Sequence, residues 1–208
     1  SNVLIQSAIN SFGSVMVAAS SAAGNVEGFI GTTMNAYYNA AITFTGQNMG
    51  AKKYDRIDSI AKVCTVLIFA TWIILGGSML IFGEQLIGIY TSDSEVIELG
   101  MERMKILMAV YFTCGIMNVF PGLTRGMGYS VLPMLCTLVG ACLMRIIWLA
   151  TFFSWYTTIF MLFVCYPITW ALAGLGQVGV FFYARRQIRK RDIVEVESPE
   201  ACGAGASQ

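Results

Sequence analysis

Six long apolar runs dominate this sequence, and they restrict the chain to a helical fold embedded in a membrane. A membrane-spanning helix needs about 20 mostly apolar residues, and a helix satisfies its backbone hydrogen bonds without help from water. Short connecting segments carry most of the charge. We therefore predict an all-α membrane protein with six transmembrane helices, over about residues 1–21, 25–47, 57–82, 101–120, 131–153 and 159–184.

Composition agrees with this prediction and excludes other classes. The 208 residues are 56% hydrophobic and 12% charged, with a mean hydropathy of +0.67, whereas soluble proteins carry about 25% charged residues. Basic residues cluster in loops and at the end of the chain, so they form no single face for nucleic acid. The chain has no histidine, and none of its six cysteines forms a Cys-x-x-Cys pair. We expect neither a metal site nor a disulfide framework.

The loop charges predict one orientation in the membrane. Basic residues mark one side, at 52–56, at Arg125 and at 185–191, whereas residues 84–102 on the other side are mainly acidic. Arg103 and Lys105 are exceptions on that acidic side. Positively charged loops favour the cytoplasmic face, so we expect a multi-pass protein of the cell (inner) membrane with a cytoplasmic C-terminus.

Finer boundaries come from turn residues and from amphipathic patterning. We predict turns at 22–24 and 154–158, a kink at Gly76-Gly77, and a glycine-rich loop over 121–130. Residues 84–100 alternate apolar and acidic side chains, which predicts two surface helices with Asp93 or Ser94 as the N-cap of the second. The tail, 192–208, is acidic, small and polar, and we expect it to be disordered.

One connecting segment is more specific than its charge. It contains Gly46-Gln47-Asn48-Met49-Gly50-Ala51, followed by Lys52, Lys53 and Arg56. Its glycines permit unusual backbone geometry, and Gln47 and Asn48 can bond backbone groups freed at a helix end. On charge alone, this is a basic loop between two spans.

The ordered string resembles the signature at the end of the eighth helix in multidrug and toxic compound extrusion (MATE) transporters. The run 121–128, with Arg125 and Gly126, looks like that family's loop between helices ten and eleven. The resemblance covers about residues 1–191. It implies a C-terminal six-helix lobe of a twelve-helix transporter, so a further N-terminal six-helix lobe is the expected partner. A complete transporter built from repeats should show a second, weaker copy of the string, and the string occurs once.

The resemblance also implies a function. Members are secondary active antiporters that export amphipathic, often cationic compounds in exchange for H⁺ or Na⁺, by alternating access between two lobes. No cofactor is expected besides the coupling ion. The bilayer and small amphipathic cations are the other expected partners.

Two charged residues within the predicted spans are candidates for ion or substrate binding. Glu27 is either a proton- or cation-responsive group, or a residue exposed at the external end of its helix. Arg145 is either a counter-charge for Glu27 or for a carboxylate of the missing lobe, or a residue that snorkels or bonds backbone carbonyls.

Polar and aromatic residues at helical spacing suggest a cavity wall. Asn35, Asn39 and Asn118 either line a cavity or bond between helices. The aromatic and methionine candidates suit a pocket for flat cations or are ordinary packing residues: Met34, Tyr37, Tyr38, Met108 and Met117.

One departure from the family concerns ion coupling. Many members carry an acid in the middle of helix ten, but residues 111–118 contain none. If the family's ion dependence holds, the coupling acid is Glu27 or lies in the other lobe. A lipid-linked-sugar flippase of the same superfamily and a structural membrane subunit remain alternatives. An enzyme is disfavoured, because no nucleophile is paired with a base.

Overall fold

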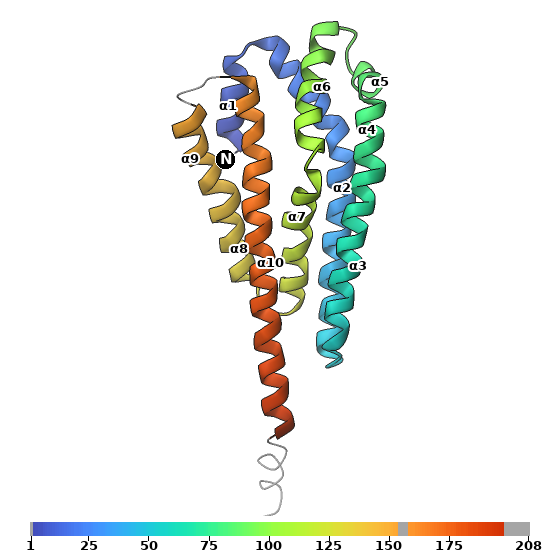
Figure 1. Ribbon diagram of the computed structural model, residues 1–208, viewed down its shortest axis with the longest axis vertical. Helices are drawn as coiled ribbons and strands as arrows, with labels where there is room; N and C mark the ends of the chain where they lie inside the picture. The colour runs from blue at the N-terminus through green and yellow to red at the C-terminus, as the bar shows by residue number, and fades with distance from the viewer. Residues whose placement is uncertain (1, 154–157, 198–208) are drawn as a thin grey trace, which may run out of the picture.

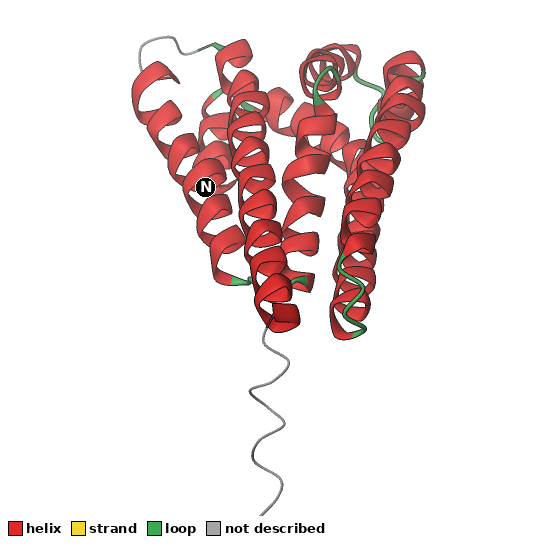
Figure 2. Ribbon diagram, turned by 60° about the horizontal axis from the view of Figure 1, so that its bottom comes forward, coloured by secondary structure: helices red, strands yellow, loops and turns green. Residues whose placement is uncertain are grey.

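The computed structural model describes residues 2–153 and 158–197 as a bundle of helices (Figure 1). The chain runs through α1 (Asn2–Ser11), α2 (Ser14–Gly50), α3 (Asp55–Thr71), the π-helical turn η1 (Trp72–Gly76), α4 (Gly77–Ile81), α5 (Gly83–Gly88), α6 (Ser94–Met108), α7 (Tyr111–Gly126), α8 (Val131–Thr137), η2 (Leu138–Leu143), α9 (Met144–Trp148), η3 (Leu149–Phe153) and α10 (Ile159–Glu197). Figure 2 shows the longer helices running side by side with the connecting segments at their ends.

Among the described residues, three helices are long and apolar enough to cross a membrane: Asp55–Ile81, Val131–Thr151 and Ile159–Arg191. The bent pair α6–α7 makes a fourth if it counts as one span. Helix α2 has 37 residues, about 55 Å at 1.5 Å per residue, but its small and polar residues keep it outside this group. The structure thus supports an all-helical, multi-pass membrane protein.

The first predicted turn is in the wrong place. Residues 22–24 lie inside α2, and the chain instead breaks at Phe12-Gly13, where Gly13 adopts a φ of 98°. That left-handed geometry favours glycine because a Cβ atom would clash. Gly24 faces Arg103: a Cβ atom there would lie 3.9 Å from Arg103 Nη2.

The predicted fourth span is two helices. Helix α6 includes the second predicted surface helix, and it is capped by Asp93, whose side chain accepts from the Glu95 amide at 3.0 Å. The Asp93 cap prediction is confirmed. Helix α6 then meets α7 at an angle of 57°. At this break the indole of Trp72 donates to the Met108 carbonyl oxygen at 2.6 Å, which satisfies a backbone acceptor at the helix end.

Two other boundaries also differ from the sequence prediction. The predicted loop over 121–130 is mostly helical, because α7 continues through a buried Pro121 to Gly126. The kink predicted at Gly76-Gly77 coincides with the end of η1. Such π-helical turns occur mostly as single-turn bulges within α-helices.

The core joins α2 to α3, α6, α7 and α10 through apolar side chains, with a second cluster between α1, the start of α2 and α10. Large apolar side chains are also exposed along α3, η1 and η2, including Val66, Ile73 and Leu138. This pattern suits a surface that faces lipid. The described cysteines form no disulfide.

The basic segments gather at one end of the bundle. The α2–α3 turn, the α7–α8 connection and the C-terminal end of α10 all lie at the lower end in Figure 1. Helix α10 continues to Glu197, so residues 192–197 are helical and not disordered as predicted. The rest of the predicted tail, and most of the turn over 154–158, lie outside the described residues.

Candidate functional site

A polar cavity forms where α2, α7 and α8 meet. Its volume is about 210 Å³. Three of the predicted site residues lie in its wall, together with Arg125; the lining residues are Asn35, Tyr38, Met117, Asn118, Pro121, Arg125 and Thr137. The structure therefore brings together residues up to 102 positions apart in sequence, from Asn35 to Thr137.

Arg125 and Tyr38 form the central interaction of this cavity. Arg125 Nη1 donates to the Tyr38 hydroxyl oxygen at 2.5 Å, and the guanidinium carbon lies 5.8 Å from the centroid of the Tyr38 ring. Asn118 Nδ2 donates to the Cys114 carbonyl oxygen at 2.8 Å, which fixes the amide against its own helix. The cavity thus presents a cation, a phenol and carboxamides beside the thioether of Met117.

Close packing of two helices positions these groups. A Cβ atom at Gly122 would lie 2.7 Å from the Tyr38 carbonyl oxygen, and one at Gly126 would lie 2.6 Å from Thr45 Cβ. Glycines four residues apart allow helix backbones to approach. Gly122 and Gly126 therefore allow α7 to pack closely against α2. Residues 121–128, the second signature segment, form a packing surface instead of the predicted loop.

A row of polar side chains on α2 lies at the surface. Asn35, Asn39 and Thr43 are all exposed, and the Thr43 hydroxyl donates to the Asn39 carbonyl oxygen at 2.9 Å. Asn39 does not line the cavity. The exposed row nevertheless continues the polar surface of the cavity wall along α2.

The other aromatic and methionine candidates are packing residues. The Tyr37 hydroxyl bonds the Thr71 hydroxyl at 2.8 Å, joining α2 to α3. Met34 and Met108 are buried in the core. For these three residues the packing interpretation is correct, whereas Tyr38 and Met117 line the cavity.

Glu27 pairs with Arg103. Arg103 Nε donates to Oε1 at 3.1 Å and Nη2 donates to Oε2 at 2.9 Å. Arg103 Nη1 also donates to the Ser20 carbonyl oxygen at 3.1 Å. Both charged side chains are 11% exposed. The alternative that Glu27 is exposed at a helix end is therefore wrong, and so is the pairing with Arg145.

Arg145 lies against α10. Its guanidinium carbon is 4.7 Å from the centroid of the Tyr166 ring, and Nη2 donates to the Thr169 hydroxyl at 3.5 Å. The side chain is buried. These contacts favour the structural interpretation of Arg145, as a link between α9 and α10.

The first signature segment closes α2. Gly46, Gln47, Asn48 and Gly50 form its last turns, and the Ala51 amide donates to the Gln47 carbonyl oxygen at 3.0 Å. The residue with left-handed geometry is Lys52, with a φ of 56°, and not one of the two glycines. Asn48 Nδ2 bonds the Phe44 carbonyl oxygen at 2.8 Å, the kind of backbone contact predicted for this residue.

Both signature segments, the cavity and the Glu27–Arg103 pair fall within the part of the chain that the MatE family model matches, residues 1–151. The chain belongs to the MatE family. A search of curated proteins finds no match. Membership in MatE implies a MATE-type transporter and not an enzyme.

Two features of this MatE chain have only weak signals in the sequence. In the sequence, Arg103 is distinguished only as a basic residue on the acidic side. The spacing of Ser20, Gly24 and Glu27 on one face of α2 is the signal that could have indicated its position. The glycine pair at 122 and 126 carried the small-xxx-small pattern of helix contacts, but the proline before it favoured a loop.

Proposed function

We propose that this chain is part of a secondary active antiporter that exports amphipathic, often cationic compounds in exchange for H⁺ or Na⁺. The observation that carries the proposal is the polar cavity between α2, α7 and α8 in a membrane protein of the MatE family. Such a site gives a substrate polar partners within an otherwise apolar bundle.

The exposed face of α2 supports this proposal. Polar side chains facing lipid are costly, yet Asn35, Asn39 and Thr43 are exposed along this helix. The exposed side chains of α3 are instead apolar at Val66 and Phe69. We infer that the α2 face borders water or another protein surface, as alternating access between two lobes requires.

The cavity also suits the proposed substrate class. The guanidinium carbon of Arg125 lies 5.8 Å from the centroid of the Tyr38 ring. Aromatic rings attract cations. A cationic substrate would replace Arg125 at this ring while Met117 adapts to its apolar part. Asn35 and Asn118 would supply carboxamide partners.

The proposal extends to the architecture and orientation. The chain would form one six-helix lobe, with spans at about the predicted residues, opposite a second six-helix lobe. The reading frame around Ser1 tests this: a further six-span segment upstream, or in a partner chain, is expected, and its absence would contradict the two-lobed account.

The basic end of the bundle would face the cytoplasm, by the positive-inside rule. A reporter that is active only in the cytoplasm can be fused after Arg191. We expect this fusion to be active. An external signal would reverse the orientation. The same reporter fused in the turn over 154–158 should give the opposite signal.

A flippase for lipid-linked sugars is the weaker candidate. Binding a pyrophosphate would require a strongly cationic cavity, and the residues that line this one include a single cation, Arg125. Export of amphipathic compounds agrees better with the carboxamides, the phenol and the thioether.

Efflux of a fluorescent cation from cells expressing the native protein tests the site. Asn35→Leu combined with Asn118→Leu makes the cavity wall apolar and should reduce efflux several-fold. The matched control is Gln85→Leu on α5, an exposed amide outside the cavity, which should leave efflux unchanged. Equal efflux from all three proteins, at equal membrane levels, would remove the cavity from the transport pathway.

A further inference from the structure

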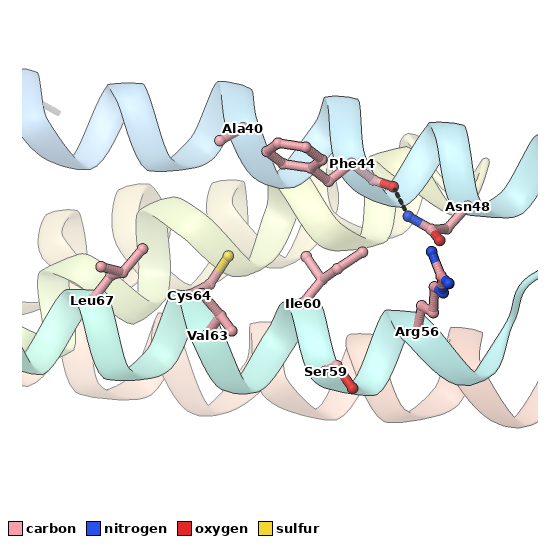
Figure 3. A pocket seen from close by; sticks show the side chains of 9 residues that line it. All are labelled: Ala40, Phe44, Asn48, Arg56, Ser59, Ile60, Val63, Cys64 and Leu67. Atoms are coloured by element: carbon pink, nitrogen blue, oxygen red, sulfur yellow. Dashed lines mark hydrogen bonds between the residues drawn. The ribbon is translucent and has the colours of Figure 1, made fainter.

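A second hollow lies between α2 and α3, separate from the polar cavity. Its volume is about 500 Å³. Figure 3 shows its walls: one stripe of side chains from α2 faces a longer stripe from α3. The lining residues are Ala40, Phe44, Asn48, Arg56, Ser59, Ile60, Val63, Cys64 and Leu67.

The groove changes character along its length. Arg56, Asn48 and Ser59 stand at the end near the α2–α3 turn, and the remaining walls are apolar. From Arg56 to Leu67 the chain advances 11 residues along one helix, about 16 Å at 1.5 Å per residue. One leaflet of a bilayer has a hydrocarbon depth of about 15 Å. The apolar part therefore matches a single acyl chain in one leaflet.

The apolar walls are exposed at the surface of the bundle. Phe44 is 55% exposed and Val63 is 57% exposed, although both lie on helices whose other faces are buried. Exposed apolar groups at this depth have lipid as their natural neighbour. The groove thus offers lateral entry to an acyl chain without requiring an opening of the bundle.

The polar end is arranged for an anion. Asn48 and Arg56 point toward one another across the end of the groove (Figure 3), and the Asn48 side chain is anchored by its bond to the Phe44 carbonyl oxygen at 2.8 Å. Within the described residues, the ion pairs join Arg103 to Glu27 and Arg185 to Asp58; Arg56 takes part in neither. Lys52 and Lys53 lie in the adjoining turn and add positive charge.

We propose that this groove binds an anionic phospholipid, with its phosphate on Arg56 and Asn48 and one acyl chain along Phe44, Ile60, Val63 and Leu67. Guanidinium groups bind phosphate oxygens through strong, charge-assisted hydrogen bonds, and basic groups beside a membrane attract anionic lipids. The proposal gives Asn48 and Arg56 of the first signature segment a ligand. It does not depend on the proposed transport activity.

Two other occupants fit less well. A cationic substrate would meet the positive charge of Arg56 at the polar end. A helix from another protein would need a longer apolar surface than the narrow stripe from Ala40 to Phe44 provides. Both are outcomes that the experiment below distinguishes.

Lipid retention by the purified native protein tests the proposal. The protein is equilibrated in mixed micelles containing equal phosphatidylglycerol and phosphatidylcholine, and bound lipid is counted by native mass spectrometry. The native protein should retain phosphatidylglycerol preferentially. Arg56→Gln should reduce this preference by at least about tenfold, the effect of losing a charged hydrogen bond. Arg189→Gln removes an exposed charge at the same end and should retain the preference.

A second pair of variants tests the acyl-chain part. Val63→Trp fills the groove and should reduce retention of both lipids, whereas Ile73→Trp, at an exposed position outside the groove, should not. Equal losses for Arg56→Gln and Arg189→Gln would overturn the headgroup site. Displacement of the lipid by glycerol phosphate alone, or by a fluorescent cation, would overturn the acyl-chain groove. Unaffected lipid retention in Val63→Trp would overturn it as well.

Discussion

Arg103 donates hydrogen bonds to both carboxylate oxygens of Glu27, at 3.1 and 2.9 Å, although the two residues are 76 positions apart in sequence. The contact joins α2 to α6 at a depth where both side chains are 11% exposed. Arg103 also donates to the Ser20 carbonyl oxygen, which lies on the same face of α2 as Glu27. The pair therefore fixes one helix against another and leaves the arginine well satisfied.

The first prediction concerns the stability that this pair provides. Glu27→Ala or Arg103→Ala leaves one charge buried without its partner, which should cost about 3 kcal/mol of unfolding free energy. The double variant should cost less than the sum of the two single variants, because neither charge is then stranded. Unfolding of the purified protein measures the three free energies in a double-mutant cycle. Additive losses would show that the pair is not coupled.

The second prediction concerns Glu27 in transport. If Glu27 is the coupling acid, its protonation would neutralise the partner of Arg103, and Glu27→Gln removes this step because the amide carries no charge at any pH. We expect lower efflux and a flatter pH dependence over about pH 6 to 8, measured with a fluorescent cation. Glu98→Gln, an exposed acid on α6, is the control and should behave as the native protein. Unchanged efflux in Glu27→Gln at every pH would remove Glu27 from the mechanism.

The third prediction separates two neighbouring tyrosines. Tyr38→Phe removes the bond from Arg125 in the cavity and should lower efflux several-fold with little change in stability. Tyr37→Phe removes the bond to Thr71 and should cost about 1 kcal/mol of stability with normal efflux per folded molecule. Efflux and thermal unfolding are measured for both. The reverse pattern would place the transport site on the α3 side of α2.

The fourth prediction concerns helix packing at the second signature segment. Gly122→Ala places a Cβ atom 2.7 Å from the Tyr38 carbonyl oxygen, and such overpacking should cost about 1–3 kcal/mol. Gly179→Ala is the matched control in α10, where a Cβ atom meets nothing within 4 Å. It should be neutral or stabilising by up to about 1 kcal/mol. Comparable stability of the two variants would contradict the close approach of α7 to α2.

The sequence predicted features that depend on local chemistry. Long apolar runs predict helices, Asp93 before an amphipathic segment predicts a cap, and the ordered string from Gly46 to Arg56 predicts the family. Each signal is contained in residues close together in the chain. The structure and the family match confirm these three predictions.

Features that depend on tertiary contacts could not be predicted in the same way. The break between α6 and α7 has neither glycine nor proline at Ala109-Val110, and it is accompanied by the Trp72 indole on the Met108 carbonyl oxygen. Pro121 indicated a loop, yet neighbouring helices keep it within α7. The sequence indicates Arg145 as a candidate counter-charge for Glu27, whereas the packing of α6 on α2 places Arg103 there.

Ion-driven uptake into vesicles tests the central claim most directly. The native protein is reconstituted, and entry of a fluorescent cation is followed under a proton gradient, under a sodium gradient, and with ATP but no gradient. The account predicts transport driven by at least one of the two ion gradients and none with ATP alone. Transport that needs ATP, or no transport under either gradient by a correctly folded protein, would contradict it.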